Sequence, residues 1–157
     1  MKMVLLSVGK SNESYVNEGI TDFTNRINKY FKAEWLIIGA PKNAASMSEQ
    51  ELKKTEAALI LQNIQKDDFL VLLDERGKSC SSPDLASFLQ QRANESTKRI
   101  VFLIGGAFGV DPQIAARADY TWSLSKLVFP HMLVRLILSE QIYRACTILR
   151  NEKYHHL

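Results

Sequence analysis

The stretch VFLIGGAFGV, residues 101–110, places four hydrophobic residues directly before a cluster of three glycines, Gly105, Gly106 and Gly109. The hydrophobic run is typical of a buried strand. Glycine supplies no packing and costs backbone entropy, so such a cluster indicates a positive φ or the close approach of a ligand to the backbone. Taken alone, the cluster fits a tight strand-to-helix turn about as well as a ligand-binding loop.

Two further loops follow strand-like runs. The loop SLSKLVFPH, residues 123–131, ends in Pro130 just before a long hydrophobic segment, and ERGKS, residues 75–79, follows a run that ends at Asp74. A solvated charged turn is the more common interpretation of ERGKS by itself. However, loops at the carboxyl ends of neighbouring strands in an open α/β sheet form small-molecule clefts. The coincidence of these loops therefore favours a binding pocket.

Strand-like and helix-like segments alternate along the chain. The expected strands are 3–8, 35–39, 69–74, 100–105 and 120–124, and the expected helices are 12–30, 48–65, 83–94, 111–117 and 131–150. Ser48 and Glu51 predict a capping box, while Ser82 and Asp111 are each expected to cap a helix that starts with proline. The alternation predicts a single domain, 1–157, of the α/β class, with an open, mostly parallel sheet and helices on both faces.

Bulk composition places the chain among globular domains. Of its 157 residues, 46% are hydrophobic and 24% charged, and the net charge of +3 is compatible with a phosphate-bearing partner without identifying one. The sequence contains no secretory signal and no apolar stretch of membrane-spanning length, which predicts a cytoplasmic protein without a membrane partner. Cys80 and Cys146 are expected to be free thiols there.

Several common sites are excluded by spacing. Gly9-Lys10-Ser11 is not a Walker A motif, because Val4 stands where that motif needs its first glycine. GGAFG lacks the G-x-G-x-x-G spacing of a dinucleotide-binding turn. No Cys/His group has metal-ligand spacing, so no metal site is expected, and no nucleophile elbow is present. A nucleotide-binding hydrolase is therefore disfavoured.

The last expected helix is apolar in nearly every direction. Two narrow polar seams interrupt it, one through His131, Arg135 and Ser139 and the other through Glu140, Arg144 and Thr147. A terminal helix buries one side against its own domain, so the remaining apolar side predicts a symmetric homodimer. A central helix within the monomer is the alternative. The tail that follows, 150–156, suits contacts with phosphates and an unstacked base, or it is a frayed end.

Taken in order, these motifs resemble the RlmH family of SPOUT-class methyltransferases. The resemblance runs from Lys2 to His156. The motifs that carry it are VGK (8–10), LDERGK (73–78) with Ser81 and Ser82, IGGAFG (104–109), SLSKLVFPH (123–131), LVRLILSEQIYRA (133–145) and YHH (154–156). The departures from the family pattern, at Phe108, Val110, Val128, Met132 and 152–153, change side chains rather than glycines or prolines.

The resemblance implies an S-adenosylmethionine donor, methylation of N3 of a pseudouridine in 23S ribosomal RNA on the assembled ribosome, an obligate homodimer and a C-terminal trefoil knot. One protomer would supply the cofactor and the other the RNA contacts. The implied cofactor-binding residues are Leu73, Gly105, Gly106, Leu124, Ser125, Lys126, Leu127, Val128 and Phe129. Backbone groups there would bond the adenine, Leu127 and Phe129 would cover its faces, and the missing side chains of Gly105 and Gly106 would let the ligand lie against the backbone.

Alkylation of N3 requires that position to lose its proton, so a nearby cation and a base are expected. The candidate side chains are His131, Arg135, Glu140, Arg144, Tyr154 and His155. Arg135 or Arg144 is expected to bind an RNA phosphate or a base carbonyl, and His155 or Tyr154 to hold a flipped base; the identity of the base stays open. A non-catalytic RNA-binding module is the alternative, and the intact glycine loops disfavour it.

Overall fold

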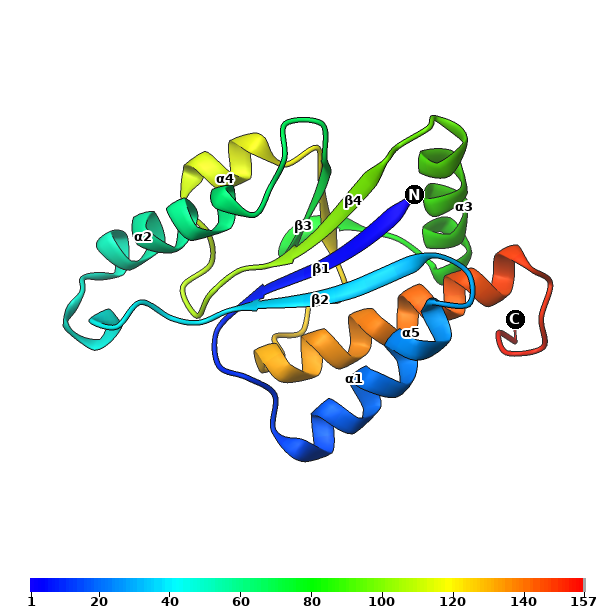
Figure 1. Cartoon of the computed structure of the whole chain (residues 1–157), viewed down its shortest axis with the longest axis horizontal. Coiled ribbons are helices and arrows are strands. Elements are labelled where there is room, and N and C mark those ends of the chain that lie inside the picture. Colours follow the sequence, from blue (N-terminus) through cyan, green and yellow to red (C-terminus); the bar gives the residue numbers. More distant parts are fainter. Residues whose placement is uncertain (157) are drawn as a thin grey trace.

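A five-stranded, all-parallel sheet with helices on both faces organises the computed structural model, which describes residues 1–156 (Figure 1). The strand order is β2-β1-β4-β3-β5. The strands are β1 (Lys2–Val8), β2 (Lys32–Ile38), β3 (Phe69–Ser79), β4 (Arg99–Ile104) and β5 (Tyr120–Ser123). The predicted α/β fold and every expected strand are confirmed, although β2 begins earlier than expected and β3 ends later.

The helices divide between the two faces of the sheet. On one face lie α1 (Ser14–Ile27), α3 (Ser82–Asn94) and α5 (His131–Leu149), and on the other lie α2 (Glu49–Gln62) and α4 (Pro112–Arg117) (Figure 1). A short 3-10 turn, η1 (Ala44–Ser46), precedes α2. Side chains of β1 alternate between the two cores, with Met3 and Leu5 in one and Val4 and Leu6 in the other. Burial on both faces explains why the strands appear in the sequence as continuous hydrophobic runs.

Helix starts follow the capping signals with one correction. The capping box of Ser48 and Glu51 is present, and Asp111 accepts a hydrogen bond from the backbone of Gln113. The expected cap at Ser82 is wrong by one residue: Ser81 is the N-cap of α3 and forms a capping box with Asp84. The reason is that Ser81 keeps an extended backbone, with ψ 166°, while Ser82 is already helical.

Helix α5 occupies the middle of its face, between α1 and α3 (Figure 1). Leu138 and Ile142 are fully buried in the core of this chain. The two polar seams therefore do not separate a monomer side from a partner side, because Ser139 of the first and Thr147 of the second are both completely buried. For most of its length α5 is the central helix that the alternative interpretation expected, while Leu133 near its start is 37% exposed.

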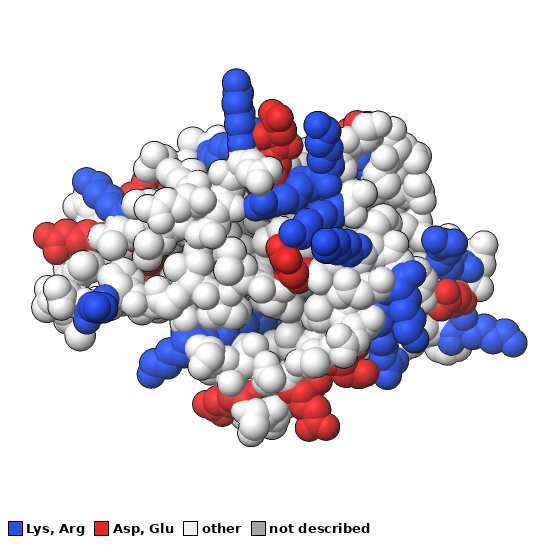
Figure 2. Space-filling model, in the orientation of Figure 1, with Lys and Arg blue, Asp and Glu red and all other residues white. Residues whose placement is uncertain are grey.

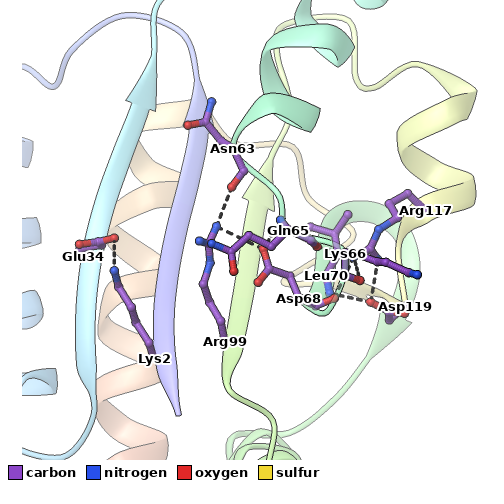
Figure 3. Close-up of polar contacts among 10 residues, drawn as sticks. All are labelled: Lys2, Glu34, Asn63, Gln65, Lys66, Asp68, Leu70, Arg99, Arg117 and Asp119. Atoms are coloured by element: carbon purple, nitrogen blue, oxygen red, sulfur yellow. Dashed lines mark hydrogen bonds and ion pairs between the residues drawn. The ribbon is translucent and has the colours of Figure 1, made fainter.

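Polar contacts hold the amino ends of the strands together (Figure 3). Lys2 of β1 pairs with Glu34 of β2 at 2.7 Å, and Arg99 of β4 pairs with the buried Asp68 at 3.2 Å. The carboxylate of Asp119 accepts a hydrogen bond of 2.7 Å from the backbone of Leu70 in β3. These contacts lie at the amino ends of the strands, whereas the loops singled out in the sequence lie at the opposite, carboxyl edge of the sheet.

Strand β3 pairs with β5 in two stretches. Leu73 and Lys78 both align with Trp122, so residues 74–77 loop out of the strand between them. A Cβ on Gly77 would lie 2.7 Å from the carbonyl carbon and oxygen of Thr121, so only glycine fits this approach. The bulge carries the charged loop after Leu73 toward the carboxyl edge of the sheet.

Candidate active site

A cavity of about 530 Å³ lies beyond the carboxyl ends of β3 and β4. These neighbouring strands send their next helices, α3 and α4, to opposite faces of the sheet (Figure 1). In an open α/β sheet, strands that diverge in this way leave a crevice at their carboxyl ends. The volume is in the range of small-molecule sites. The cavity is lined by residues 72–76, 104–110, 124–125 and 127–129, together with Lys53, His131 and Val134.

The three loops singled out in the sequence meet at this cavity. Of the expected cofactor-binding residues, Leu73, Gly105, Gly106, Leu124, Ser125, Leu127, Val128 and Phe129 line it, and Lys126 does not. Lys53 reaches the same wall from α2. No motif marks Lys53, because a single lysine on an exposed helix is ordinary in sequence, and only the packing of α2 against the glycine loop reveals its position.

The structure gives a different reason for glycine at positions 105, 106 and 109 than the close approach of a ligand. A Cβ on Gly105 would lie 2.7 Å from Val110 Cγ1, and a Cβ on Gly106 would lie 2.7 Å from Glu56 Oε1. Gly109 has a φ of +84° and donates a backbone hydrogen bond of 3.0 Å to Gly106. The space beside Gly105 and Gly106 is therefore filled by protein atoms rather than left for a ligand, and the cluster builds a tight turn that lines the cavity.

Charged and apolar groups surround the mouth of the cavity. Arg76 binds both carboxylate oxygens of Asp74, at 3.0 and 2.8 Å, and this hydrogen bonding lowers the pKa of Asp74. Leu127 and Val128 are 70% and 80% exposed, and Phe108 is also largely exposed. Exposed large apolar side chains gathered at one cavity mark a surface that a ligand or another chain covers.

His131 is the candidate catalytic side chain that lines the cavity. Burial, and next the positive charge of Arg135, lower the pKa of His131 below its ordinary value of 6.5. The imidazole is therefore neutral at neutral pH and can accept a proton. His131 is the first residue of α5, and the loop that connects β5 to α5 through Pro130 positions it at the cavity.

Arg135 lies away from the cavity, in a buried polar network. It is 1% exposed, and its Nε donates a hydrogen bond of 2.8 Å to Ser7 Oγ. Its Nη1 donates to the carbonyl oxygen of Lys10 at 2.7 Å and to Asn12 Oδ1 at 2.8 Å. The guanidinium thus ties α5 to the end of β1 and the turn before α1, and these bonds satisfy a charge that is costly to bury.

The second polar seam and the tail form one cluster, which we call the tail cluster: Glu140, Arg144, Tyr154 and His155. Glu140 Oε1 accepts hydrogen bonds from Arg144 at 3.0 and 2.6 Å and from the Tyr154 hydroxyl at 3.1 Å. Arg144 also lies 4.8 Å from the centroid of the Tyr154 ring and 3.3 Å from His155 Nδ1. These contacts hold the tail against α5 up to His155, so this part of the tail is not a frayed end.

One polar atom of the tail cluster has no hydrogen-bond partner among the described residues. The Nε2 atom of His155 is buried and has no hydrogen-bond partner within residues 1–156. Burial, followed by the hydrogen bond to Glu140, raises the pKa of Tyr154, which keeps its hydroxyl protonated. On the face drawn in Figure 2, basic and acidic side chains are interspersed and acidic ones gather over α1.

The cavity and the tail cluster are separate sites within one chain. No member of the tail cluster lines the cavity. His131 and Glu140 are nine residues apart on α5, which at 1.5 Å per residue corresponds to about 13 Å. The structure thus brings the expected cofactor residues, except Lys126, together with His131 at the cavity. Glu140, Arg144, Tyr154 and His155 gather at the tail cluster, and Arg135 belongs to neither group.

Comparison with known proteins identifies the family. The family model described as "Predicted SPOUT methyltransferase" matches residues 1–155. A protein of Cytophaga hutchinsonii named ribosomal RNA large subunit methyltransferase H is 42% identical over 156 residues, which cover 99% of this chain and 100% of the relative. A protein of the same name from Acetivibrio thermocellus is 39% identical over 158 residues, with 99% of each chain covered.

A solved structure, described as a "probable methylase family protein" from Haemophilus influenzae, has a TM-score of 0.52 at 13% identity and covers 99% of this chain and 70% of that chain. At this identity the likeness supports the fold alone. The family model and the full-length relatives decide the assignment: this chain belongs to the SPOUT methyltransferase family.

Proposed function

We propose that this protein transfers a methyl group from S-adenosylmethionine to N3 of a pseudouridine in 23S ribosomal RNA, on the assembled ribosome in the cytoplasm, and that residues 1–157 act as one domain. The observation that carries the proposal is the cavity at the switch point between β3 and β4, lined by nearly all the expected cofactor residues. Relatives named as methyltransferases of large-subunit ribosomal RNA support the RNA substrate.

The cavity suits an adenosine-bearing cofactor in size and in wall chemistry. Residues 124–130 belong to neither helix nor strand. Pro130 O accepts a hydrogen bond from Val134 N, Ser125 O accepts one from Ser123 Oγ, and Leu127 N donates one to Ser125 Oγ. The other backbone groups of this loop can hydrogen-bond an adenine edge. Leu127 and Phe129 line the same wall and can cover the faces of the ring. When bound, S-adenosylmethionine supplies a methyl group already activated by the sulfonium, so the protein mainly positions the reactants and handles charge.

We assign the remaining chemistry to His131 and the tail cluster. His131 is neutral and lines the cofactor cavity, so it is placed to accept the proton that N3 must lose. Arg144 can bind an RNA phosphate or a base carbonyl and favour the anionic ring. Tyr154 and His155 are the groups that would hold an extruded base, by stacking and hydrogen bonding.

A homodimer would join the two separate sites. The outward side of α5 carries the exposed Leu133 and the half-buried Ile137, which are apolar and available to a second copy. If two α5 helices pack side by side in opposite directions, the start of one helix faces the later turns of the other. The cavity of one subunit would then lie near the partner's Arg144, which gives a site built from both chains.

The path of the chain after β5 supports a trefoil knot in the C-terminal half. β5 lies at the edge of the sheet, whereas α5 lies in the middle of one face, between α1 and α3. Residues 124–130 must therefore cross the carboxyl ends of β3 and β4, close to the loops that leave those strands. We propose that this crossing threads α5 through the segment that connects β3 to β4, against the general preference for unthreaded chains.

Mass mapping of 23S ribosomal RNA tests the reaction. Cells that lack the protein should lose one methyl group on one pseudouridine, and adding back the wild-type protein should restore it. Calorimetry with S-adenosylmethionine separates an enzyme from a non-catalytic RNA-binding module, which has no use for the cofactor. An unchanged modification map, or a wild-type protein that fails to bind the cofactor, would contradict the proposed function.

Subunit mixing tests the shared site. Gly106→Val should disable the cavity and Arg144→Ala the tail cluster, so each variant alone should be nearly inactive. Random re-pairing makes half of the dimers mixed, and each mixed dimer keeps one intact site out of two, so about a quarter of wild-type activity should return. Each variant re-paired with itself is the control. If mixing restores nothing while the wild type is active, the two halves of the site come from the same chain.

A further inference from the structure

A carboxylate lies buried beside the cofactor cavity without a partner. Glu56, on α2, is 6% exposed. Within residues 1–156, its carboxylate makes no hydrogen bond and no ion pair, and burial alone raises its pKa. Partial loss of water without a compensating bond is costly for a carboxylate, and groups with pKa values perturbed in this way cluster at functional sites.

Gly106 connects this carboxylate to the cavity. The Glu56 carboxylate fills the space that a side chain at position 106 would occupy, with Oε1 and Cδ only 2.7 and 2.8 Å from the Cβ position. Gly106 itself lines the cavity. The charge of Glu56 therefore lies directly against backbone that forms the cavity wall, close enough to act electrostatically on a bound ligand.

The charged groups around the cavity do not neutralise Glu56. Lys53, one turn earlier on α2, pairs with Glu49 at 3.8 Å. In the bulge of β3, Arg76 is paired with Asp74, and Glu75 carries the same sign as Glu56. At the start of α4, Asp111 is acidic and caps its own helix. His131, at the start of α5, is neutral. No cationic side chain among the described residues pairs with Glu56, so a positively charged ligand in the cavity would be the partner that neutralises it.

We propose that Glu56 is a specificity-determining residue that selects a cationic ligand in this cavity, and so favours the sulfonium donor over its neutral thioether product. The inference rests on the proposed function, since that function supplies the donor and product. The two molecules share the adenosine and amino acid parts and differ in one methyl group and one positive charge. Selection by charge would help the cavity to release product and take up fresh donor.

Proton release gives the inference a second signature. In the empty cavity the raised pKa of Glu56 favours its protonated form. A bound sulfonium favours the carboxylate, so donor binding should expel a proton, and donor affinity should rise with pH while Glu56 titrates. The product carries no charge on sulfur, so its binding should expel fewer protons.

Calorimetry on the full chain with S-adenosylmethionine and S-adenosylhomocysteine tests this. Glu56→Gln keeps the shape of the side chain and should reduce the preference for donor over product about tenfold. The same titrations in buffers of different ionisation enthalpy, from about pH 5 to about pH 7, should show more proton release in the wild type than in the variant. His131, which also lines the cavity, contributes equally to both proteins. Glu18→Gln, an exposed substitution on α1, is the charge-matched control and should behave like the wild type.

The outcomes separate the inference from the proposed function. If Glu56→Gln binds donor and product in the wild-type ratio, the inference is overturned while donor binding still upholds the proposed function. If the variant does not fold, the wild type alone decides: a donor-to-product preference that is constant with pH overturns the inference. A wild type that binds neither molecule would overturn both.

Discussion

Two buried charged residues on opposite faces of the sheet show two ways of keeping a charge inside a protein. Arg135, on α5, donates hydrogen bonds to Ser7, Lys10 and Asn12, and these bonds offset the loss of water. Glu56, on α2, has no such bonds among the described residues, and burial raises its pKa. The first residue therefore stabilises the fold, while the second costs stability beside a ligand site.

Arg135→Met should destabilise the protein by about 3 kcal/mol, because it leaves the polar groups of Ser7, Lys10 and Asn12 without their donor. Urea unfolding measures the change, and Arg26→Met, which removes a half-exposed cation on α1, is the control and should cost less than about 1 kcal/mol. A fully stable Arg135→Met protein that no longer methylates RNA would show instead that Arg135 contacts the substrate, as the sequence predicted.

Glu56 should make stability depend on pH in a known direction. Its pKa is raised in the folded state, so the folded protein binds the proton more tightly than the unfolded chain does, and stability falls as pH rises above the ordinary value of 4.5 through the folded pKa. Glu56→Gln stays neutral and should be more stable than the wild type near about pH 7.5 and equal to it near about pH 4. Urea midpoints at several pH values check this, and equal midpoints throughout would contradict it.

At the scale of the element, α5 is apolar all round because it packs on three sides: the sheet, α1 and α3. Its outward side carries the exposed Leu133 and half-buried residues such as Ile137. A helix buried in this way has no amphipathic pattern from which its orientation can be predicted. Whether a given apolar residue of α5 serves the core or a second copy is therefore decided by packing.

Charge substitutions on α5 should separate folding from assembly. Leu138→Asp places a charge at a fully buried position and should unfold the protein, with a cost above about 4 kcal/mol. Leu133→Asp, at an exposed position on the same helix, should leave the fold intact and convert the proposed dimer to monomer. Circular dichroism and light scattering distinguish the two results. A Leu133→Asp protein that remains dimeric would place the dimer contact elsewhere.

At the scale of the whole molecule, the proposed cofactor cavity lies at one end of α5 and the proposed RNA contacts lie further along the same helix. The cavity opens where the loops after β3, β4 and β5 meet, and the tail cluster lies about 13 Å further along the helix. Binding of the cofactor and turnover of RNA should therefore respond to different substitutions.

Removal of residues 154–157 tests this separation; Leu157 lies outside the described residues. The truncated protein should bind S-adenosylmethionine within about twofold of the wild type, because no tail residue lines the cavity, and should lose at least about a hundredfold in methyl incorporation on ribosomes, as expected when base-holding groups are removed. Calorimetry and methyl incorporation measure the two effects. Wild-type methylation by the truncated protein would leave the tail cluster without a role in catalysis.

The sequence by itself determined the class of fold, the order of its elements and the three loops that line the cavity. These features depend on neighbours within a few residues: hydrophobic runs, capping boxes such as Ser48 with Glu51, and glycines after strands. The carboxyl ends of neighbouring parallel strands meet at one edge of the sheet, so a cavity between these loops could be predicted from the sequence. The family resemblance supplied the individual candidate residues, and all of them except Lys126 line that cavity.

The tertiary structure alone decided what the individual residues do there. Gly106 makes room for Glu56, fifty residues earlier in the chain, and Arg135 bonds Ser7 across 128 positions. Such pairs depend on which strand lies beside which and on the face to which each crossover helix returns, and no local pattern encodes them. For the same reason, the separation of the tail cluster from the cavity emerged only when α5 was placed between α1 and α3.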